Sequence, residues 1–376
     1  MPQKVLITAS TFAHIRSFHL PYIARFHEAG LEVHVACGGT PVEIPEADRL
    51  LALPLQKKMQ SPDNLNAAAI LRRAMEQERY ALICTHTSLA AFFTRVAAAG
   101  CHPRPPLVYM CHGYLFDDDS SALRRSVLLA AERMTARQTD LLLTMNAYDD
   151  RLARQYRLGG RIRKVPGVGV DFDRLAPERP DAAPSLRAKL GIPEDAFVLF
   201  YAAEFSPRKS QAFLIQAMRE LPEQVVLVLA GTGALLDDCK AQTAQLDLGR
   251  RVYFPGHVSP VGDWYAMADA AVSSSRSEGL PFNIMEAMHA GLPVVASDVK
   301  GNADLIIHGR SGLLYPYGNT AAYAAQIRTL LASDTLRQQL GNQARVDVAP
   351  YGLEAVLPQV WDCYASLLGL PEAVRV

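Results

Sequence analysis

The stretch FVLFYAAEFSPRKSQAFLIQAM, residues 197–218, and the stretch VVLVLAGTG, residues 225–233, decide the fold. Phe197–Ala202 is a short apolar run that predicts a buried strand, and apolar residues recur at helical spacing within Gln211–Glu220. Val225–Ala230 predicts a second buried strand, which runs into a pair of glycines. This strand–loop–helix–strand order is typical of a parallel sheet with helices on both faces.

The same order of elements recurs on both sides of that stretch. Further short buried strands are predicted at Lys4–Ile7, Glu32–Ala36, Ala81–Cys84, Leu107–Met110, Leu141–Thr144, Lys164–Val165, Val252–Phe254, Ala271–Ser273 and Val294–Ala296. Helices are predicted at Ser17–Ala29, from about Asp149, and at Leu353–Leu368. We therefore expect two Rossmann-like, doubly wound α/β domains that face a central cleft.

The domain boundaries follow from composition. Residues 171–190 are rich in proline, alanine and charge, which is typical of a linker leading into a helix. We expect an N-terminal domain at residues 1–170, a C-terminal domain at residues 191–350, and a final helix in residues 351–376 that crosses back to the N-terminal domain. The 376 residues suffice for two such cores.

Composition restricts the class of protein. The 38 lysines and arginines balance 38 aspartates and glutamates, so net charge gives no reason to expect nucleic-acid binding. The six cysteines form no CxxC pair and are typical of reduced thiols. No apolar run approaches the roughly 18–20 residues that span a bilayer. We expect a cytoplasmic protein, at most peripheral to the cytoplasmic face of a membrane.

The segment SSSRSEGLPFNIMEAMHAGLPVVASD, residues 273–298, carries the densest candidate chemistry. Loops at the carboxyl ends of parallel strands bind anions through helix N-termini. Glu278 and Glu286 lie eight positions apart, so one carboxylate can accept hydrogen bonds from a sugar while the other reaches a ribose diol. Asn283 is predicted to cap a helix that begins at Ile284. The alternative is a purely structural role, in which Asn283 and Glu286 form a capping box at the helix N-terminus.

Residues 278–298 resemble the E-x7-E segment of retaining glycosyltransferases of family four, which have the GT-B fold. The flanking motifs occur in the family's order: FYAAEFSPRKSQAFLIQAM (200–218), VVLVLAGTG (225–233), VYFPGHV (252–258) and SGLLYP (311–316). Together they cover essentially the whole C-terminal domain. E-x7-E alone is a weak pattern, but five motifs in order are specific.

The resemblance implies a nucleotide-sugar donor and roles for individual residues. Glu278 would contact the donor hexose, Glu286 the ribose, and Lys209 the diphosphate leaving group. The implied donor-binding residues are Arg208, Lys209, Gly231, Gly233, His257, Val258, Glu278, Gly279, Leu280, Phe282, Asn283, Ile284 and Glu286, and the implied catalytic residues are His112, Lys209 and Glu278.

The sequence departs from the family at two positions. Glu204 stands where many members have an arginine, and Ser210 stands where they have a glycine. Either Arg208 takes the part of that arginine, or Glu204 has another role, such as orienting Lys209.

Three histidine-containing loops follow predicted strands of the N-terminal domain. His14 and Arg16 follow the first strand, and His86 and His112 follow two others. A single loop histidine is usually a surface residue, but three at one sheet edge predict a shared crevice. Their spacing does not match that of a metal site, so no metal is expected. By resemblance, His112 would lie near the reacting sugar, and His14, Arg16 and His86 would contact the acceptor.

Parts of the N-terminal half are similar to a polysaccharide-assembly subgroup of the family. These parts are FHLPYIARFHEAGLEVHVA (18–36), THTSLAAFFTRVAAAG (85–100), HGYLF (112–116) and PGVGVD (166–171). The subgroup implies transfer of a hexose or N-acetylhexosamine from a UDP-sugar to a polyprenyl-diphosphate-linked glycan in capsule or exopolysaccharide synthesis. The basic, amphipathic Leu123–Thr139 could rest on anionic lipid, or it could be an ordinary packed helix.

The expected reaction is transfer with retention, without a metal or cofactor, in which the leaving phosphate accepts the acceptor's proton. Two alternatives stay open: a sugar-nucleotide epimerase of similar architecture, and a non-catalytic sugar-nucleotide-binding protein. An oxidoreductase is disfavoured because neither domain opens with a GxGxxG fingerprint.

Overall fold

The computed structural model describes residues 2–118, 120–176 and 182–371. The chain forms two compact units. The N-terminal unit comprises Met1–Gly169 together with Glu354–Val376, and the C-terminal unit comprises Val170–Leu353. The tip of the predicted linker, residues 177–181, and the last five residues of the predicted final segment lie outside the described residues. Each unit is described by itself.

The N-terminal unit is built on a parallel sheet, with seven strands in the described residues. The strand order is β3-β2-β1-β4-β5-β6-β7, so the direction of chain progression reverses between β1 and β4. The strands are β1 (Lys4–Ala9), β2 (Glu32–Gly38), β3 (Arg49–Leu53), β4 (Leu82–His86), β5 (Leu107–Cys111), β6 (Leu141–Thr144) and β7 (Arg161–Lys164). In a doubly wound sheet, ligands bind at the carboxyl ends of the strands that flank such a reversal.

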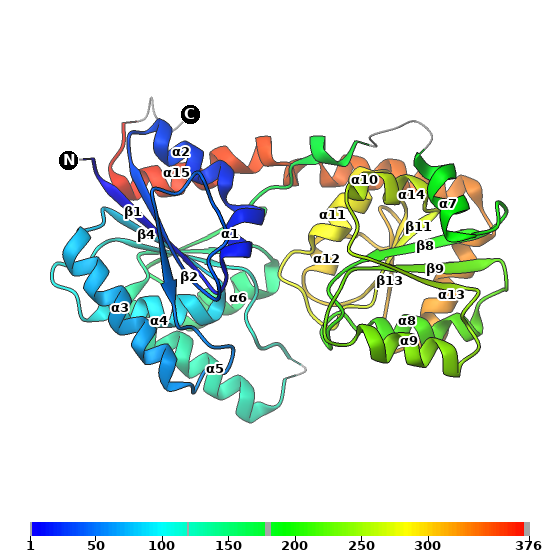
Figure 1. Cartoon of the computed structure of the whole chain (residues 1–376), viewed down its shortest axis with the longest axis horizontal. Helices are drawn as coiled ribbons and strands as arrows, with labels where there is room; N and C mark the ends of the chain where they lie inside the picture. The colour runs from blue at the N-terminus through cyan, green and yellow to red at the C-terminus, as the bar shows by residue number, and fades with distance from the viewer. Residues whose placement is uncertain (1, 119, 177–181, 372–376) are drawn as a thin grey trace. The chain divides into compact units, whose positions relative to one another are not determined.

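Helices cover both faces of this sheet, with α3, α4 and α5 on one face and α2 and α15 on the other (Figure 1). The helices are α1 (Phe12–Phe18), α2 (Leu20–Glu28), α3 (Pro62–Glu78), α4 (Ser88–Ala99), α5 (Ala122–Thr135), α6 (Ala147–Tyr156) and α15 (Leu353–Leu368). The α15 residues Trp361 and Tyr364 pack on Phe26 of α2, with ring centroids 5.2 and 5.7 Å away. The chain's final helix thus completes the core of the N-terminal unit.

The predicted helix Ser17–Ala29 is confirmed over Leu20–Glu28, but its start is wrong because two helices occupy this region. α1 ends at Phe18 and α2 begins at Leu20, and His19 between them has φ −123° and ψ 0°. Pro21 lies in the first turn of α2, where its missing N–H has no intrahelical partner to lose. The break at His19 redirects the chain just after the first strand.

The C-terminal unit contains a second parallel sheet, with six strands in the part of the chain described. Its order is β10-β9-β8-β11-β12-β13, and the reversal falls between β8 and β11. The strands are β8 (Phe197–Ala202), β9 (Val225–Ala230), β10 (Val252–Gly256), β11 (Ala270–Ser273), β12 (Val294–Ser297) and β13 (Leu313–Tyr315).

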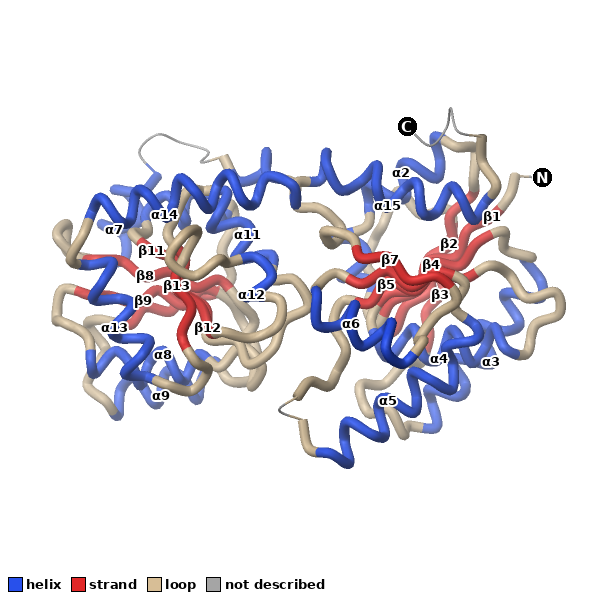
Figure 2. The backbone as a smooth tube through the Cα atoms, turned by 180° about the vertical axis from the view of Figure 1, so that it is seen from behind, coloured by secondary structure: helices blue, strands red, loops and turns tan. Residues whose placement is uncertain are grey.

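Helices cover both faces of this sheet as well, and the two views agree on their placement (Figures 1 and 2). α8, α9 and α13 lie on one face, and α11 and α14 lie on the other. The helices are α7 (Ala182–Leu190), α8 (Gln211–Ala217), α9 (Leu236–Gln245), α10 (Val261–Met267), α11 (Phe282–His289), α12 (Asn302–Leu305), α13 (Thr320–Leu331) and α14 (Asp334–Val348). The predicted linker contains a 3-10 turn at Phe172–Leu175 and the whole of α7.

Two features bear on the expected cellular setting. All six cysteines are buried and free of disulfides. Among the described residues, no helix combines the length and the apolar character that a bilayer crossing needs.

Candidate functional site

Three charged side chains meet at the strand reversal of the C-terminal unit. Arg208 and Lys209 lie in the loop after β8, and Glu278 lies in the loop after β11, the neighbouring strand. Lys209 Nζ lies 2.6 Å from Glu278 Oε1, and Arg208 Nη1 lies 2.5 Å from Glu278 Oε2. The structure therefore brings together the three charged residues that the sequence singled out from two separate motifs.

The electrostatics of Glu278 depend on this pair of cations. The Glu278 side chain is only 6% exposed, and burial alone would raise its pKa. The charges of Lys209 and Arg208 outweigh the burial and hold the pKa of Glu278 below its usual value. Glu278 is consequently a carboxylate at neutral pH, and two positive charges lie at the same edge of the sheet.

Buried hydroxyl groups fix the backbone on which these charges sit. The Ser274 hydroxyl donates to the carbonyl of Lys209 at 2.9 Å, and the Tyr201 hydroxyl lies 2.9 Å from the Ser275 hydroxyl. Gly301 passes so close to Glu278 that a Cβ on it would lie 2.8 Å from the Glu278 Cβ. None of these residues was predicted, although three successive serines directly after an apolar strand were a readable signal.

Backbone conformation explains the glycines of this edge and one departure from the family pattern. A Cβ on Gly231 would lie 2.1 Å from the Ala203 carbonyl oxygen, and a Cβ on Gly233 would lie 2.4 Å from that of Phe205. Ser210 has φ 54° and ψ 41°, a left-handed conformation that favours glycine. The family's usual glycine after the lysine thus has a conformational reason, and this chain adopts the same conformation with serine.

Glu204 does not orient Lys209 in the structure. The carboxylate that contacts Lys209 is that of Glu278, and the Glu204 side chain is exposed. Gln211 donates to the backbone carbonyl of Glu204 at 2.9 Å. Arg208 shares Glu278 with Lys209.

Glu286 lies on α11 and is held by a residue that the sequence did not reveal. The Tyr265 hydroxyl contacts Glu286 Oε2 at 2.9 Å and the Asn283 carbonyl at 3.1 Å. Burial raises the pKa of Glu286, and the hydrogen bond from Tyr265 partly opposes this rise. Tyr265 comes from α10, 21 positions before Glu286, which is why no local motif connects the two.

The predicted start of α11 is wrong by two residues. The helix begins at Phe282 with Pro281 as its N-cap, so Asn283 lies inside the first turn and forms no capping box with Glu286. Proline suits this position because it needs no N–H partner. The first intrahelical hydrogen bond runs from the Met285 N–H to the Pro281 carbonyl at 3.2 Å.

The other predicted donor-binding residues line the carboxyl edge of the same sheet or the start of α11. Gly279 and Leu280 join β11 to α11, and His257 and Val258 directly follow β10. The side chain of Ile284 is buried in the core, so only its backbone could serve a ligand.

Four histidines gather at the strand reversal of the N-terminal unit. His14 lies on α1 after β1, His86 ends β4, and His112 follows β5. His19, at the break between α1 and α2, joins them although it was not predicted. His14 Nε2 lies 3.3 Å from His19 Nε2, and His86 Nδ1 lies 3.2 Å from His112 Nε2.

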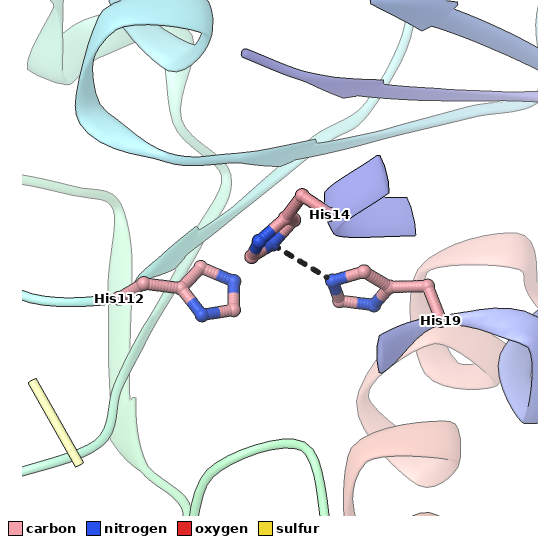
Figure 3. A group of neighbouring side chains, drawn as sticks. All are labelled: His14, His19 and His112. Carbon is pink, nitrogen blue, oxygen red and sulfur yellow. Dashed lines mark hydrogen bonds between the residues drawn. The ribbon is translucent and has the colours of Figure 1, made fainter. Parts of the chain in front are cut away.

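The ring nitrogens of this cluster converge. Figure 3 shows the rings of His14, His19 and His112 turned toward one another, and one nitrogen from each lies within 4.8 Å of the others. Sequence spacing did not indicate this convergence, because the loops that carry these histidines are far apart in sequence and meet at one sheet edge. Arg16 is exposed and two positions from His14 on the same helix, so it faces elsewhere.

Burial keeps these imidazoles neutral. It lowers the pKa of His14 to about 4. Burial, together with repulsion from neighbouring histidines, also lowers the pKa of His19, His86 and His112 well below the usual value. All four rings carry a nitrogen lone pair at neutral pH.

Helix α5 presents an apolar stripe to solvent. Leu123, Val127 and Met134 are 77%, 58% and 71% exposed, and their spacing puts them on one side of the helix. Leu128 of the same helix packs against the core instead. Arg124 and Arg133 of the same helix are exposed beside the stripe. Hereafter these three apolar residues are called the α5 stripe.

Comparisons with known proteins agree with this architecture. Residues 22–174 match the family described as Glycosyltransferase Family 4, and residues 183–347 match the family described as Glycosyl transferases group 1. A solved structure of Anabaena Alr3699/HepE, in complex with UDP and glucose, superposes with a TM-score of 0.80 at 22% identity, covering 97% of this chain and 100% of that one. The two parallel α/β sheets are those of the GT-B fold.

One relative that matches nearly the whole chain shows the family, and a second is similar over part of it. The Bacillus subtilis protein named "Putative glycosyltransferase EpsD" is 31% identical over 375 residues, 98% of each chain. An Escherichia coli protein, named UDP-Gal:alpha-D-GlcNAc-diphosphoundecaprenol alpha-1,3-galactosyltransferase, is 28% identical over 64% of this chain and 60% of its own length. The chain belongs to the glycosyltransferase group 1/family 4 superfamily.

Proposed function

We propose that this glycosyltransferase moves a hexose or N-acetylhexosamine, with retention, from a UDP-sugar to a polyprenyl-diphosphate-linked glycan in surface-polysaccharide synthesis. The observation that supports the donor is the Arg208–Lys209–Glu278 cluster at the strand reversal of the C-terminal unit. A nucleoside diphosphate would meet two cations and the start of α11, both of which favour an anion. The similarity to the E. coli galactosyltransferase supports the choice of a UDP-sugar and a lipid-linked acceptor.

In this proposal, the C-terminal unit stabilises the leaving group. Lys209 and Arg208 turn from Glu278 toward the diphosphate, which gains negative charge as the sugar–phosphate bond breaks. Glu278 is then available to accept hydrogen bonds from sugar hydroxyls, which are donors. The acceptor hydroxyl attacks the face that the diphosphate leaves, its proton passes to the leaving phosphate oxygen, and the configuration at the anomeric carbon is retained.

Glu286 would accept a hydrogen bond from the ribose through the carboxylate oxygen that Tyr265 does not contact. A protonated Glu286 is a poorer acceptor, so UDP affinity should fall as the pH drops. In Tyr265→Phe the hydrogen bond that lowers the pKa of Glu286 is lost, so the fall should begin at higher pH, and affinity at neutral pH should drop about tenfold or more. Calorimetric titration with UDP between about pH 5 and pH 8 measures both effects.

Tyr253→Phe is the matched control for that titration. The Tyr253 hydroxyl donates to a backbone carbonyl, that of Arg250, at 3.0 Å. The UDP phosphate titrates in the same way with the wild-type protein, Tyr265→Phe and Tyr253→Phe. Only a difference between the pH profiles of the two variants therefore reports on Glu286. If Tyr265→Phe and Tyr253→Phe gave the same pH profile, Glu286 would not be the ribose-binding carboxylate.

The acceptor proposal places the enzyme at a membrane, and the α5 stripe is the surface that would contact it. An exposed apolar stripe with arginines beside it fits insertion among anionic headgroups. The protein should co-sediment with vesicles that contain phosphatidylglycerol and much less with phosphatidylcholine vesicles. Met134→Asp should weaken this binding about tenfold or more, because burial of a methionine contributes about 1.5–3 kcal/mol.

Val346→Asp supplies the control for the vesicle experiment. Val346 is 66% exposed on α14 of the C-terminal unit, so the substitution adds the same charge at a similar exposure. Equal vesicle binding by Met134→Asp and Val346→Asp would refute a role for the α5 stripe.

The reaction itself is tested by incubating the enzyme with a panel of UDP-hexoses and UDP-N-acetylhexosamines and a polyprenyl-diphosphate-linked N-acetylhexosamine. The expected product carries the donor's anomeric configuration, which proton coupling constants report. An inverted product would contradict retention. A changed sugar without acceptor would identify an epimerase, and donor binding without turnover would identify a non-catalytic protein.

A further inference from the structure

Two nitrogens of the histidine cluster have the spacing of two ligands of one metal ion, and a third lies nearby. Tetrahedral zinc holds imidazole nitrogens at about 2.0–2.1 Å, which places two of its ligands about 3.3–3.4 Å apart. The Nε2 atoms of His14 and His19 are 3.3 Å apart, and a nitrogen of His112 lies within 4.8 Å of a nitrogen on each. A small inward movement of the His112 ring would complete a three-nitrogen set.

The chemistry of the rings suits a transition metal. Each neutral imidazole ring offers one nitrogen lone pair, and such a nitrogen binds zinc, copper, iron or nickel.

His86 lies beside this set. Its Nδ1 lies 3.2 Å from His112 Nε2, and its ring centroid lies 3.9 Å from that of His19. In Figure 3 the Nε2 of His112 is the nitrogen turned toward His14 and His19.

We propose that His14, His19 and His112 bind one divalent transition-metal ion. Three neutral ligands leave the ion with its full charge and an open position, and that position would take water or an anionic oxygen such as a phosphate. The site lies within the N-terminal unit alone and does not depend on the proposed donor or acceptor.

The test uses the full-length, untagged protein after treatment with EDTA and desalting. Titration with Co²⁺ should give the visible absorption of a nitrogen-ligated, four-coordinate ion, and calorimetry with Zn²⁺ should give one ion per chain with micromolar or tighter affinity. His14→Ala and His112→Ala should each weaken Zn²⁺ binding at least about 100-fold.

His102→Ala is the control, because His102 is an exposed histidine of the same unit. Circular dichroism of each variant checks that the unit is folded, and the side chains of His14 and His112 are each only partly buried. Absence of stoichiometric binding, or binding that His14→Ala and His102→Ala affect equally, would overturn the proposal. Binding of inorganic phosphate by the metal-free protein, with no uptake of Zn²⁺, would also overturn it.

Discussion

Lys209→Ala is expected to lower kcat about 10²–10³-fold while the protein stays folded. Lys209 is the more buried of the two cations that contact Glu278, with its side chain 12% exposed against 50% for Arg208. The proposed reaction needs this cation when the departing diphosphate gains negative charge. The loss should fall on kcat more than on KM, because the charge develops in the transition state. Stability should change little, because Arg208 still pairs with Glu278 in the variant.

The pH dependence of this variant offers a second check. In the wild-type protein, burial raises the pKa of Glu278 but Lys209 and Arg208 lower it further than burial raises it. Without Lys209 the pKa of Glu278 should rise, so the acid limb of the remaining activity should move to higher pH. Lys240→Ala, which removes an exposed lysine that contacts Asp237 at 3.8 Å, is the control. Turnover by Lys209→Ala equal to that of Lys240→Ala would contradict the proposed role.

Glu132→Ala is expected to destabilise the N-terminal unit by about 3–5 kcal/mol. Arg95 is fully buried, its Nη2 lies 2.8 Å from Glu132 Oε2, and its guanidinium lies over the Tyr109 ring at 4.6 Å. Arg95 also donates to the Ala91 carbonyl. Removing Glu132 leaves a charge in the core without its counter-ion, and water cannot replace that partner without opening the packing. Urea unfolding followed by circular dichroism measures the change in free energy.

Glu76→Ala provides a matched control, because the Arg72–Glu76 pair has the same 2.8 Å separation but both side chains are about half exposed. Its loss should cost less than about 1 kcal/mol. Replacing both buried partners, with Arg95→Met and Glu132→Leu in one protein, should recover most of the stability, because no unpaired charge remains. If Glu132→Ala cost no more than Glu76→Ala, burial would not control the strength of this pair.

Much of the fold could be predicted because buried parallel strands are continuous apolar runs. Phe197–Ala202, Val225–Ala230 and Leu141–Thr144 have in the structure the bounds that the sequence predicted. β3 was not predicted, because Arg49–Leu53 is an edge strand in which most residues are at least partly exposed. Its neighbour α3, Pro62–Glu78, was also missed, since no motif drew attention to it.

The candidate sites show the same division. Lys209 and Glu278 each follow an apolar strand, and the rule that ligands lie at strand reversals brings them together. Tyr265 and His19 could not be found this way. Tyr265 reaches Glu286 from another helix, and His19 lies at the break between α1 and α2, inside the region where a single helix was expected. Residues that orient other residues leave weaker signals in a single sequence than residues that carry the charge.

The most direct test of the donor site is a crystal structure of the protein with UDP bound. The account predicts a phosphate oxygen within about 3 Å of Lys209 Nζ, the diphosphate at the start of α11, and the ribose within hydrogen-bonding distance of Glu286. A diphosphate bound elsewhere, with the Lys209–Glu278 ion pair unchanged, would contradict it.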